Sequence, residues 1–157
     1  MSGILVVYAT KNGSTKAVAD AIAIELQVNG ATVDVRAAKA ARDPVTGRDL
    51  VVLGGAIYSG RWHRDAHRFL KRHRQDLAGV PIAVFGMGPR EDRPESWQRT
   101  RAQLDHALAK RPWLTPAAVA VFGGADPPGR SDRRARRDLR DWTAIRHWAR
   151  EVADNIA

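Results

Sequence analysis

Apolar and polar residues follow one another along this chain in blocks that predict strands and helices in turn. The first block is the apolar run 4–8, which breaks into a polar turn at residues 10–15. After the turn, apolar residues recur at helical spacing until Asn29-Gly30, a typical end of a helix. We therefore expect a strand and then a helix that Ser14 or Thr15 caps, with a buried stripe of Val18, Ala21, Ile22, Leu26 and Val28.

The same order of blocks continues toward the C-terminus. Short apolar or alternating runs bounded by Gly or Pro are typical of strands, and they occur at 32–36, 50–53, 82–85 and 117–122. Helices are expected at 64–74, from Pro94, and after Asp141, which we expect to cap the last one. The positions expected to face inward are Ala66, Phe69, Leu70 and His73, then Trp97, Leu104, Ala107 and Leu108, then Trp142, Ile145, Ala149, Val152 and Ile156.

Regular alternation of strands and helices predicts an α/β fold, in which right-handed crossovers cover both faces of a parallel sheet with helices. With 157 residues and no internal repeat, we expect one domain over residues 1–157. Ligands of such sheets bind beyond the carboxyl ends of the strands. The loops 10–15, 54–62 and 86–93 all follow strands, so we expect them to converge on one site.

The turn 10–15 has the composition of an anion-binding loop. It combines the charge of Lys11 and the Asn12 amide with free backbone N–H groups at the start of the next helix. Hydroxyl groups come from Thr10, Ser14 and Thr15. We interpret the turn as a phosphate-binding loop; the alternative is a strand-to-helix turn without a ligand.

Several familiar phosphate-binding folds are disfavoured because their sequence motifs are missing from this chain. The chain has no GxxxxGK[ST] run, and its first turn has no GxGxxG, which disfavours a P-loop hydrolase and a dinucleotide site of that kind. A response-regulator receiver needs an acidic pair after the first strand and an acceptor Asp after the third. This chain has Ala9-Thr10 and Gly54-Gly55 at those places.

Charge and composition narrow the possible classes of function further. The formal net charge is +9, almost all of it from arginine, which would attract nucleic acid, anionic lipid or acidic small molecules, unless the arginines are only a solvated surface. The chain has no cysteine, which excludes disulfides, thiolate catalysis and Cys-ligated metal centres. No apolar stretch is long enough for a membrane helix and no signal peptide is evident, so we expect a soluble cytoplasmic protein.

Three stretches resemble the flavodoxin family, and within it the flavodoxin-like proteins related to menaquinone-dependent protoporphyrinogen oxidase. They are YATKNGSTKAVADAIA at the first turn, GGAIYSGRWHRDAHRFLKRH after the third strand, and RDWTAIRHWA in the last helix. The resemblance implies a doubly wound sheet of five parallel strands in the order 2-1-3-4-5, with helices on both faces. It also implies FMN as the cofactor.

The resemblance further implies which residues hold FMN. The phosphate would lie on Thr10, Lys11, Asn12, Gly13, Ser14 and Thr15. The ring would be wrapped by Ala56, Ile57, Tyr58, Ser59 and Gly60, with Tyr58 stacking on it, and by Gly86, Met87, Gly88 and Pro89. The third loop lacks the aromatic residue that many flavodoxins place over the second ring face. That face would then be open to substrate or covered by Trp62 or Trp97.

The remaining histidines and arginines give weaker evidence of a functional role. His63 and His67 lie one helical turn apart, as two metal ligands can, but with no third ligand nearby we interpret them as surface histidines, and we expect no metal site. His73, His106 and His147 are isolated, and we interpret them as structural. The arginines 133, 134, 136 and 137 form a dense basic run within segment 130–140, whose role is open. No residue pair suggests acid–base or nucleophilic catalysis, which suits a flavoprotein because its cofactor carries the redox chemistry.

Three functions remain open at this point. The first is an FMN-dependent oxidoreductase that passes electrons from an acidic or porphyrinogen-type substrate to a quinone. The second is an electron carrier without a substrate, and the third is a flavin-free basic binding domain. For the first, Arg61, Arg64 and Arg90 are expected near the flavin, where they would stabilise its reduced anion, pair with substrate carboxylates, or hold the protein peripherally at the anionic inner face of the membrane. Nucleic acid is a disfavoured partner, and a homodimer is left open.

Overall fold

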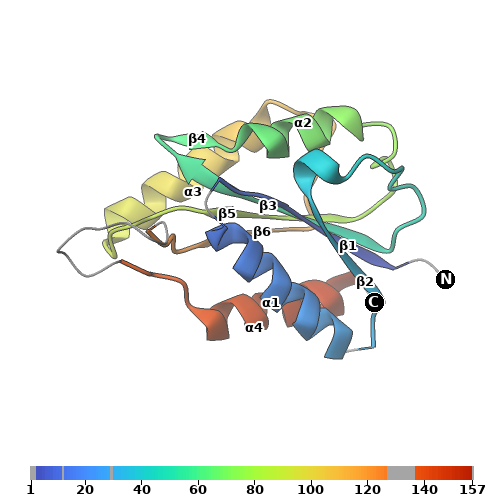
Figure 1. Ribbon diagram of the computed structural model, residues 1–157. Helices are drawn as coiled ribbons and strands as arrows, with labels where there is room; N and C mark the ends of the chain where they lie inside the picture. The colour runs from blue at the N-terminus through green and yellow to red at the C-terminus, as the bar shows by residue number, and fades with distance from the viewer. Residues whose placement is uncertain (1–2, 12, 29, 127–136, 157) are drawn as a thin grey trace.

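The computed structural model describes residues 3–11, 13–28, 30–126 and 137–156 (Figure 1). Within these ranges strands and helices alternate as the hydrophobic pattern predicts. The elements are β1 (Ile4–Ala9), α1 (Ser14–Val28), β2 (Val33–Ala37), the 3₁₀ helix η1 (Ala38–Ala40), β3 (Leu50–Tyr58), β4 (Arg61–Trp62), α2 (Arg64–Arg72), β5 (Ile82–Met87), α3 (Pro94–Ala109), β6 (Ala118–Phe122) and α4 (Trp142–Ile156).

The sheet has the strand order β2-β1-β3-β5-β6, and every neighbouring pair along this path is parallel. The expected order 2-1-3-4-5 is therefore confirmed, with β5 and β6 as its fourth and fifth strands. One strand was not expected. The short β4 pairs antiparallel with the end of β3, where Ile57 lies opposite Trp62, because the chain reverses through a tight turn at Ser59 and Gly60.

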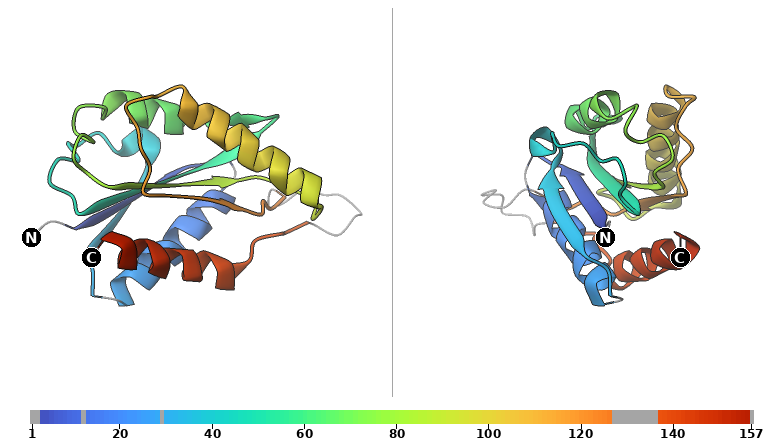
Figure 2. Two further views of the ribbon diagram at one scale, coloured as in Figure 1. Left: turned by 180° about the vertical axis from the view of Figure 1, so that it is seen from behind. Right: turned by 90° about the vertical axis from the view of Figure 1, so that its right-hand side faces the viewer.

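Helices cover both faces of the sheet, α1 and α4 on one face and α2 and α3 on the other (Figures 1 and 2). Side chains of β1 alternate between the two layers: Ile4 and Val6 pack with α1 and α4, whereas Leu5 and Val7 pack with α2 and the end of α3. Both faces are buried, which explains why the strands read as continuous apolar runs.

Strand β3 extends further than its apolar run indicates. Gly54 and Gly55 lie inside the strand, where a Cβ on Gly54 would come within 1.9 Å of the Phe85 ring and one on Gly55 within 2.6 Å of the Trp62 indole nitrogen. The two glycines make room for aromatic rings on the two sides of the sheet. The sequence analysis was wrong to end the strand at them.

Some helix caps and buried positions also differ from those expected from the sequence. Helix α1 begins at Ser14, so Ser14 and Thr15 lie within its first turn, and Gly13, with φ +88°, precedes it in place of the expected cap. Val28, expected to face inward, is 76% exposed. Asp141 does cap α4, because its Oδ1 accepts the N–H of Ala144 at 3.1 Å.

The starts of α1, α3 and α4 gather at the end of the molecule where the parallel strands finish, at the left of Figure 1. This is the end at which the three loops were expected to meet. None of the helices in the described part of the chain has the length and apolar character needed to span a bilayer.

Candidate functional site

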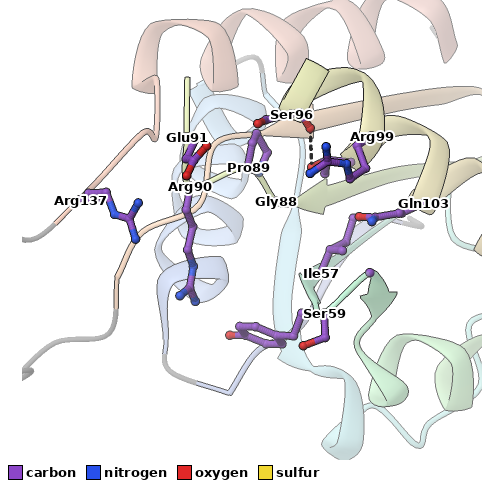
Figure 3. A pocket seen from close by; sticks show the side chains of 13 residues that line it. Ile57, Ser59, Gly88, Pro89, Arg90, Glu91, Ser96, Arg99, Gln103 and Arg137 are labelled. Atoms are coloured by element: carbon purple, nitrogen blue, oxygen red, sulfur yellow. Dashed lines mark hydrogen bonds between the residues drawn. The ribbon is translucent and has the colours of Figure 1, made fainter. Parts of the chain in front are cut away.

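A cavity of about 470 Å³ opens at the carboxyl end of the sheet. Its walls come from the β3–β4 turn, from the segment that follows β5, and from one face of α3 (Figure 3). The lining residues are Ile57, Tyr58, Ser59, Gly60, Gly88, Pro89, Arg90, Glu91, Ser96, Arg99, Thr100, Gln103 and Arg137. The structure thus brings two of the three predicted loops together and adds a helix.

The β3–β4 turn forms one wall with an unusual backbone. Ser59 and Gly60 have φ values of +49° and +77°, the combination that a two-residue hairpin turn requires. Among the described residues Ser59 is the only non-glycine with positive φ, and this conformation costs a side-chain-bearing residue about 1 kcal/mol or more. The tight turn places the half-buried Tyr58 at the edge of the cavity.

The segment after β5 is held from both sides. The N–H of Gly88 donates to the Phe122 carbonyl at 2.9 Å, and the N–H of Gly124 donates to the Pro89 carbonyl at 3.0 Å. On the other side, a Cβ at Gly88 would lie 2.0 Å from Cγ2 of Thr100. Only a glycine lets α3 pack this closely on the loop, so Gly88 sets the position of the third wall.

Helix α3 supplies that wall as a polar stripe. Ser96, Arg99, Thr100 and Gln103 recur at helical spacing and share one face of the helix. Thr100 is 6% exposed, and its hydroxyl donates to the Ser96 carbonyl at 3.0 Å. The sequence analysis examined only the apolar face of this helix and missed the stripe, although polar residues at spacings of three and four beside a predicted loop were a usable signal.

Positive charge dominates the cavity. Arg90 and Arg137 both approach Asp126, at 3.9 and 3.7 Å, and this carboxylate also accepts the backbone N–H of Arg137 at 2.8 Å. Asp126 is only 7% exposed. One buried carboxylate therefore faces two guanidinium groups, and Arg99 adds a third cation from α3, against the exposed Glu91.

The first turn lies at the start of α1. Within this turn the backbone N–H of Gly13 donates to Oγ1 of Thr10 at 3.0 Å. Lys11 is exposed. Thr15 is completely buried, and its hydroxyl has no hydrogen-bond partner among the described residues. A buried hydroxyl left unpaired costs about 1 to 3 kcal/mol. This turn has an unsatisfied polar group of the kind that an anionic ligand can pair.

The predicted residues fall into distinct places. Ile57, Tyr58, Ser59, Gly60, Gly88 and Pro89 line the cavity, whereas Ala56, Gly86 and Met87 are buried within β3 and β5 and do not line it. The residues Thr10, Lys11, Gly13, Ser14 and Thr15 lie outside the cavity wall, and Asn12 is outside the described residues. The expectation that Ala56, Ile57, Tyr58, Gly86 and Met87 lie in loops is wrong, because β3 and β5 extend beyond their apolar runs.

The two tryptophans considered as covers of a ring face have other roles. Trp62 is 3% exposed, packs in the core under α2, and meets His67 edge-on at 5.5 Å. Trp97 is half-buried, and its indole N–H donates to Asp92 at 2.9 Å. Neither lines the cavity, so the wall opposite the β3–β4 turn is polar rather than aromatic.

The arginines near the cavity differ from the expected set. Arg90 lines it, as predicted, but Arg61 on β4 and Arg64 at the start of α2 do not. Arg99 and Arg137 line it instead. Of the dense arginine run, Arg137 is described, and positions 133, 134 and 136 lie outside the described residues.

The paired histidines of α2 have partners within the fold. His63 caps the helix, since its Nδ1 accepts the N–H of Asp65 at 3.0 Å, and burial lowers its pKa. Nδ1 of His67 lies 2.8 Å from the guanidinium of Arg111, which donates to it. Burial, with smaller contributions from the charges of Arg111 and Lys110, lowers the pKa of His67 to about 4. Both side chains therefore serve the packing of α2.

Comparison with known proteins adds three kinds of likeness. Residues 5–126 match the family described as "Flavodoxin domain". Over 169 aligned residues the chain is 24% identical to "Protoporphyrinogen IX dehydrogenase [quinone]" of Escherichia coli (strain K12), covering 95% of this chain and 93% of that protein.

Solved structures of similar fold include two flavodoxins of comparable length. Oxidised flavodoxin 2 from Bacillus cereus aligns with a TM-score of 0.62 at 20% identity, covering 98% of this chain and 99% of that one. The flavodoxin of Fusobacterium nucleatum bound to flavin mononucleotide aligns with a TM-score of 0.61 at 17% identity, covering 98% of each chain. These likenesses agree with the strand order and the two helical layers described above.

Proposed function

Because the chain belongs to the flavodoxin domain family, we propose that it binds FMN and acts in electron transfer. The observation that carries the proposal is the buried Thr15 hydroxyl, which lacks a partner among the described residues at the start of α1. A phosphate on the turn 10–15 would pair this hydroxyl and the free N–H groups of the first helical turn, with Lys11 adding charge. The donor set therefore fits the phosphate of FMN.

The ring of the cofactor would lie against the β3–β4 turn. Tyr58, half-buried at the edge of the cavity, is the residue that we propose to stack on it, and Gly88 and Pro89 would supply backbone on the other side. Ala56, Gly86 and Met87 support these contacts from within their strands. When bound, FMN supplies one- and two-electron chemistry, and the protein binds, orients and surrounds it.

The charge of the surroundings favours uptake of electrons. Arg90, Arg99 and Arg137 line the cavity, and a positive environment stabilises negative charge gained on reduction, which raises the reduction potential. We propose on this basis that the protein takes electrons from a substrate rather than serving only as a low-potential carrier. A potential as low as that of acidic electron carriers would contradict this.

The substrate and acceptor are proposed from two supports. The relative in Escherichia coli is named as a dehydrogenase of protoporphyrinogen IX with a quinone, and the cavity here is cationic. We propose an acidic or porphyrinogen-type donor and a quinone acceptor. The second candidate, an electron carrier without its own substrate, is favoured by the likeness to small flavodoxins, and the absence of turnover with any such donor and quinone pair would select it.

The exposed surface of α2 is our basis for proposing where in the cell the reaction takes place. Arg64, Arg68, Lys71 and Arg72 are all exposed on this helix, which β4 connects to the cavity wall. We propose that this basic surface contacts anionic lipid on the cytoplasmic face of the membrane, in whose hydrocarbon core quinones dissolve. Co-sedimentation with anionic but not with neutral vesicles, lost at high salt, is the expected result; equal sedimentation with both would oppose it.

The cheapest test of the proposed function is reconstitution. The purified protein, stripped of small molecules, should acquire a flavin absorbance spectrum on addition of FMN and should bind riboflavin, which lacks the phosphate, far more weakly. A protein that binds neither compound would leave only the flavin-free binding domain. Equal affinity for both would place the phosphate away from the turn 10–15.

A further inference from the structure

Helix α3 presents three polar side chains to the cavity, and none of them has a side-chain partner in the described part of the chain. They are Ser96, Arg99 and Gln103, spaced three and four residues apart. Figure 3 shows Arg99 and Gln103 extending from the helix toward the side of the cavity where Gly88 and Ile57 lie. A small number of polar groups that converge on a cavity can fix the orientation of a bound ligand.

Arg99 differs in this respect from the arginines around it. Arg101, two residues further along the helix, pairs with Asp105 at 3.0 Å, and Arg93 approaches Glu91 at 3.9 Å. Arg90 and Arg137 share Asp126. Within the described ranges Arg99 forms no ion pair within 4.0 Å, although Glu91 lines the same cavity and Glu95 lies one helical turn away, so its guanidinium remains available to a ligand.

We propose that Ser96, Arg99 and Gln103 form a subsite for a carboxylate or sulfonate group of the redox substrate or acceptor. The planar guanidinium of Arg99 can donate two parallel hydrogen bonds to such a group, which a lysine cannot do. The Gln103 amide, near the β3–β4 turn, and the Ser96 hydroxyl can add donors. The inference rests on the proposed function, since the ligand it selects is the partner of a bound flavin.

This subsite is separate from the proposed phosphate site. None of the residues 10–15 that the structure describes lines the cavity, and the oxidised FMN ring carries no anionic group that would require an arginine at the α3 wall. An anion held by Arg99 therefore belongs to a second molecule. The subsite sets specificity: it favours ligands with an acidic group over neutral ligands of the same shape.

The test uses a pair of redox-inert probes of matched shape, naphthalene-2-sulfonate and 2-naphthol, whose binding is measured calorimetrically with FMN-loaded and with FMN-free protein. We expect the sulfonate to bind more tightly than the naphthol, and Arg99→Gln to weaken sulfonate binding about tenfold or more without changing naphthol binding. Arg99→Lys should give an intermediate loss. The FMN dissociation constant should stay at the wild-type value in both variants.

Arg101→Gln is the matched control, because Arg101 is on the same helix and exposed but does not line the cavity. An equal loss of sulfonate binding in Arg101→Gln would reduce the effect to long-range charge and overturn the subsite. A weakened FMN affinity in Arg99→Gln would assign Arg99 to the cofactor and overturn it as well.

The same design separates this proposal from the proposed function. If the wild-type protein binds no FMN, the electron-transfer role fails, while the probes still report the subsite in the FMN-free protein. If FMN binds normally and the sulfonate shows no preference over the naphthol, the subsite fails alone. Oxidation of the reduced FMN-loaded protein by 1,4-naphthoquinone-2-sulfonate and by neutral 2-methyl-1,4-naphthoquinone gives a second readout. Arg99→Gln should lower the ratio of the first rate to the second, because any change in flavin potential acts on both acceptors.

Discussion

The turn at the start of α1 and the polar stripe of α3 both offer unpaired polar groups at the same end of the sheet, but they are built differently. The turn is one contiguous segment, in which backbone N–H groups and side chains converge because a strand passes directly into a helix. The stripe is spread over two turns of a helix and becomes a wall only when Gly88 lets α3 approach. A contiguous segment forms locally, whereas a wall between elements depends on packing.

The largest expected effect comes from a double substitution in the turn, which leaves the polar stripe of α3 unchanged. The double variant Thr10→Ala/Thr15→Ala removes two hydroxyls, each worth about 1.5 to 3 kcal/mol when bonded to a charged group, so FMN affinity should fall by about 3 to 6 kcal/mol. Thr10 also accepts the N–H of Gly13, so the turn itself should loosen. FMN titration followed by fluorescence quenching measures the loss.

Two controls sharpen this prediction. Thr15→Ser keeps a hydroxyl and should retain most of the affinity, while sulfonate binding at the stripe should be the same in the double variant as in the wild type. Wild-type FMN affinity in the double variant would show that the phosphate binds elsewhere.

A smaller effect breaks the stripe and leaves the turn intact. In Gly88→Ala the new methyl group would overlap Cγ2 of Thr100, so α3 must move away from the loop. Overpacking of this kind costs about 1 to 3 kcal/mol of stability, and sulfonate binding should weaken because Arg99 moves with the helix. Urea unfolding and calorimetry measure the two losses.

The compensating variant Gly88→Ala/Thr100→Ser removes the overlapping methyl group of Thr100. It should recover part of both losses, since the serine hydroxyl can still donate to the Ser96 carbonyl. No recovery would mean that the glycine is required for a reason other than the approach of α3.

The smallest effect concerns acid, and it comes from His67 in the layer of α2 and α3. His67 has its pKa lowered from 6.5 to about 4, chiefly by burial, so the unfolded chain binds a proton more readily than the folded one. Stability should therefore decrease as the pH falls from 6.5 toward 4 and lose no more from this group below that value. With allowance for partial solvent exposure the loss is about 1 to 2 kcal/mol.

Thermal unfolding at a series of pH values tests this expectation against His67→Gln. The variant should show a flatter profile between pH 6.5 and 4, because glutamine cannot acquire the charge that would repel Arg111 and Lys110. Identical profiles for the two proteins would assign the acid sensitivity to other groups.

Much of the fold was predictable because its signals are local. Apolar runs for strands, helical spacing and the cap at Asp141 each depend on a few neighbouring residues, and the strand order agrees with the resemblance to flavodoxins. The wrong predictions concern positions whose conformation depends on a side chain far away in the sequence. Gly54 and Gly55 look like the end of a strand, yet they continue β3 because Phe85 and Trp62 occupy the space that their side chains would fill.

The sequence by itself therefore determined the alternating elements, the layers and the polar first turn, since each of these follows from hydrophobic spacing or from adjacent residues. The tertiary structure decided that Arg99 and Gln103 face a cavity and that Trp62 belongs to the core, with His67 packed edge-on against it. It also decided that Arg90 and Arg137 share one buried carboxylate. These facts depend on which elements meet, and side chains far apart in the chain acquire a common environment only when packing brings their helices and loops together.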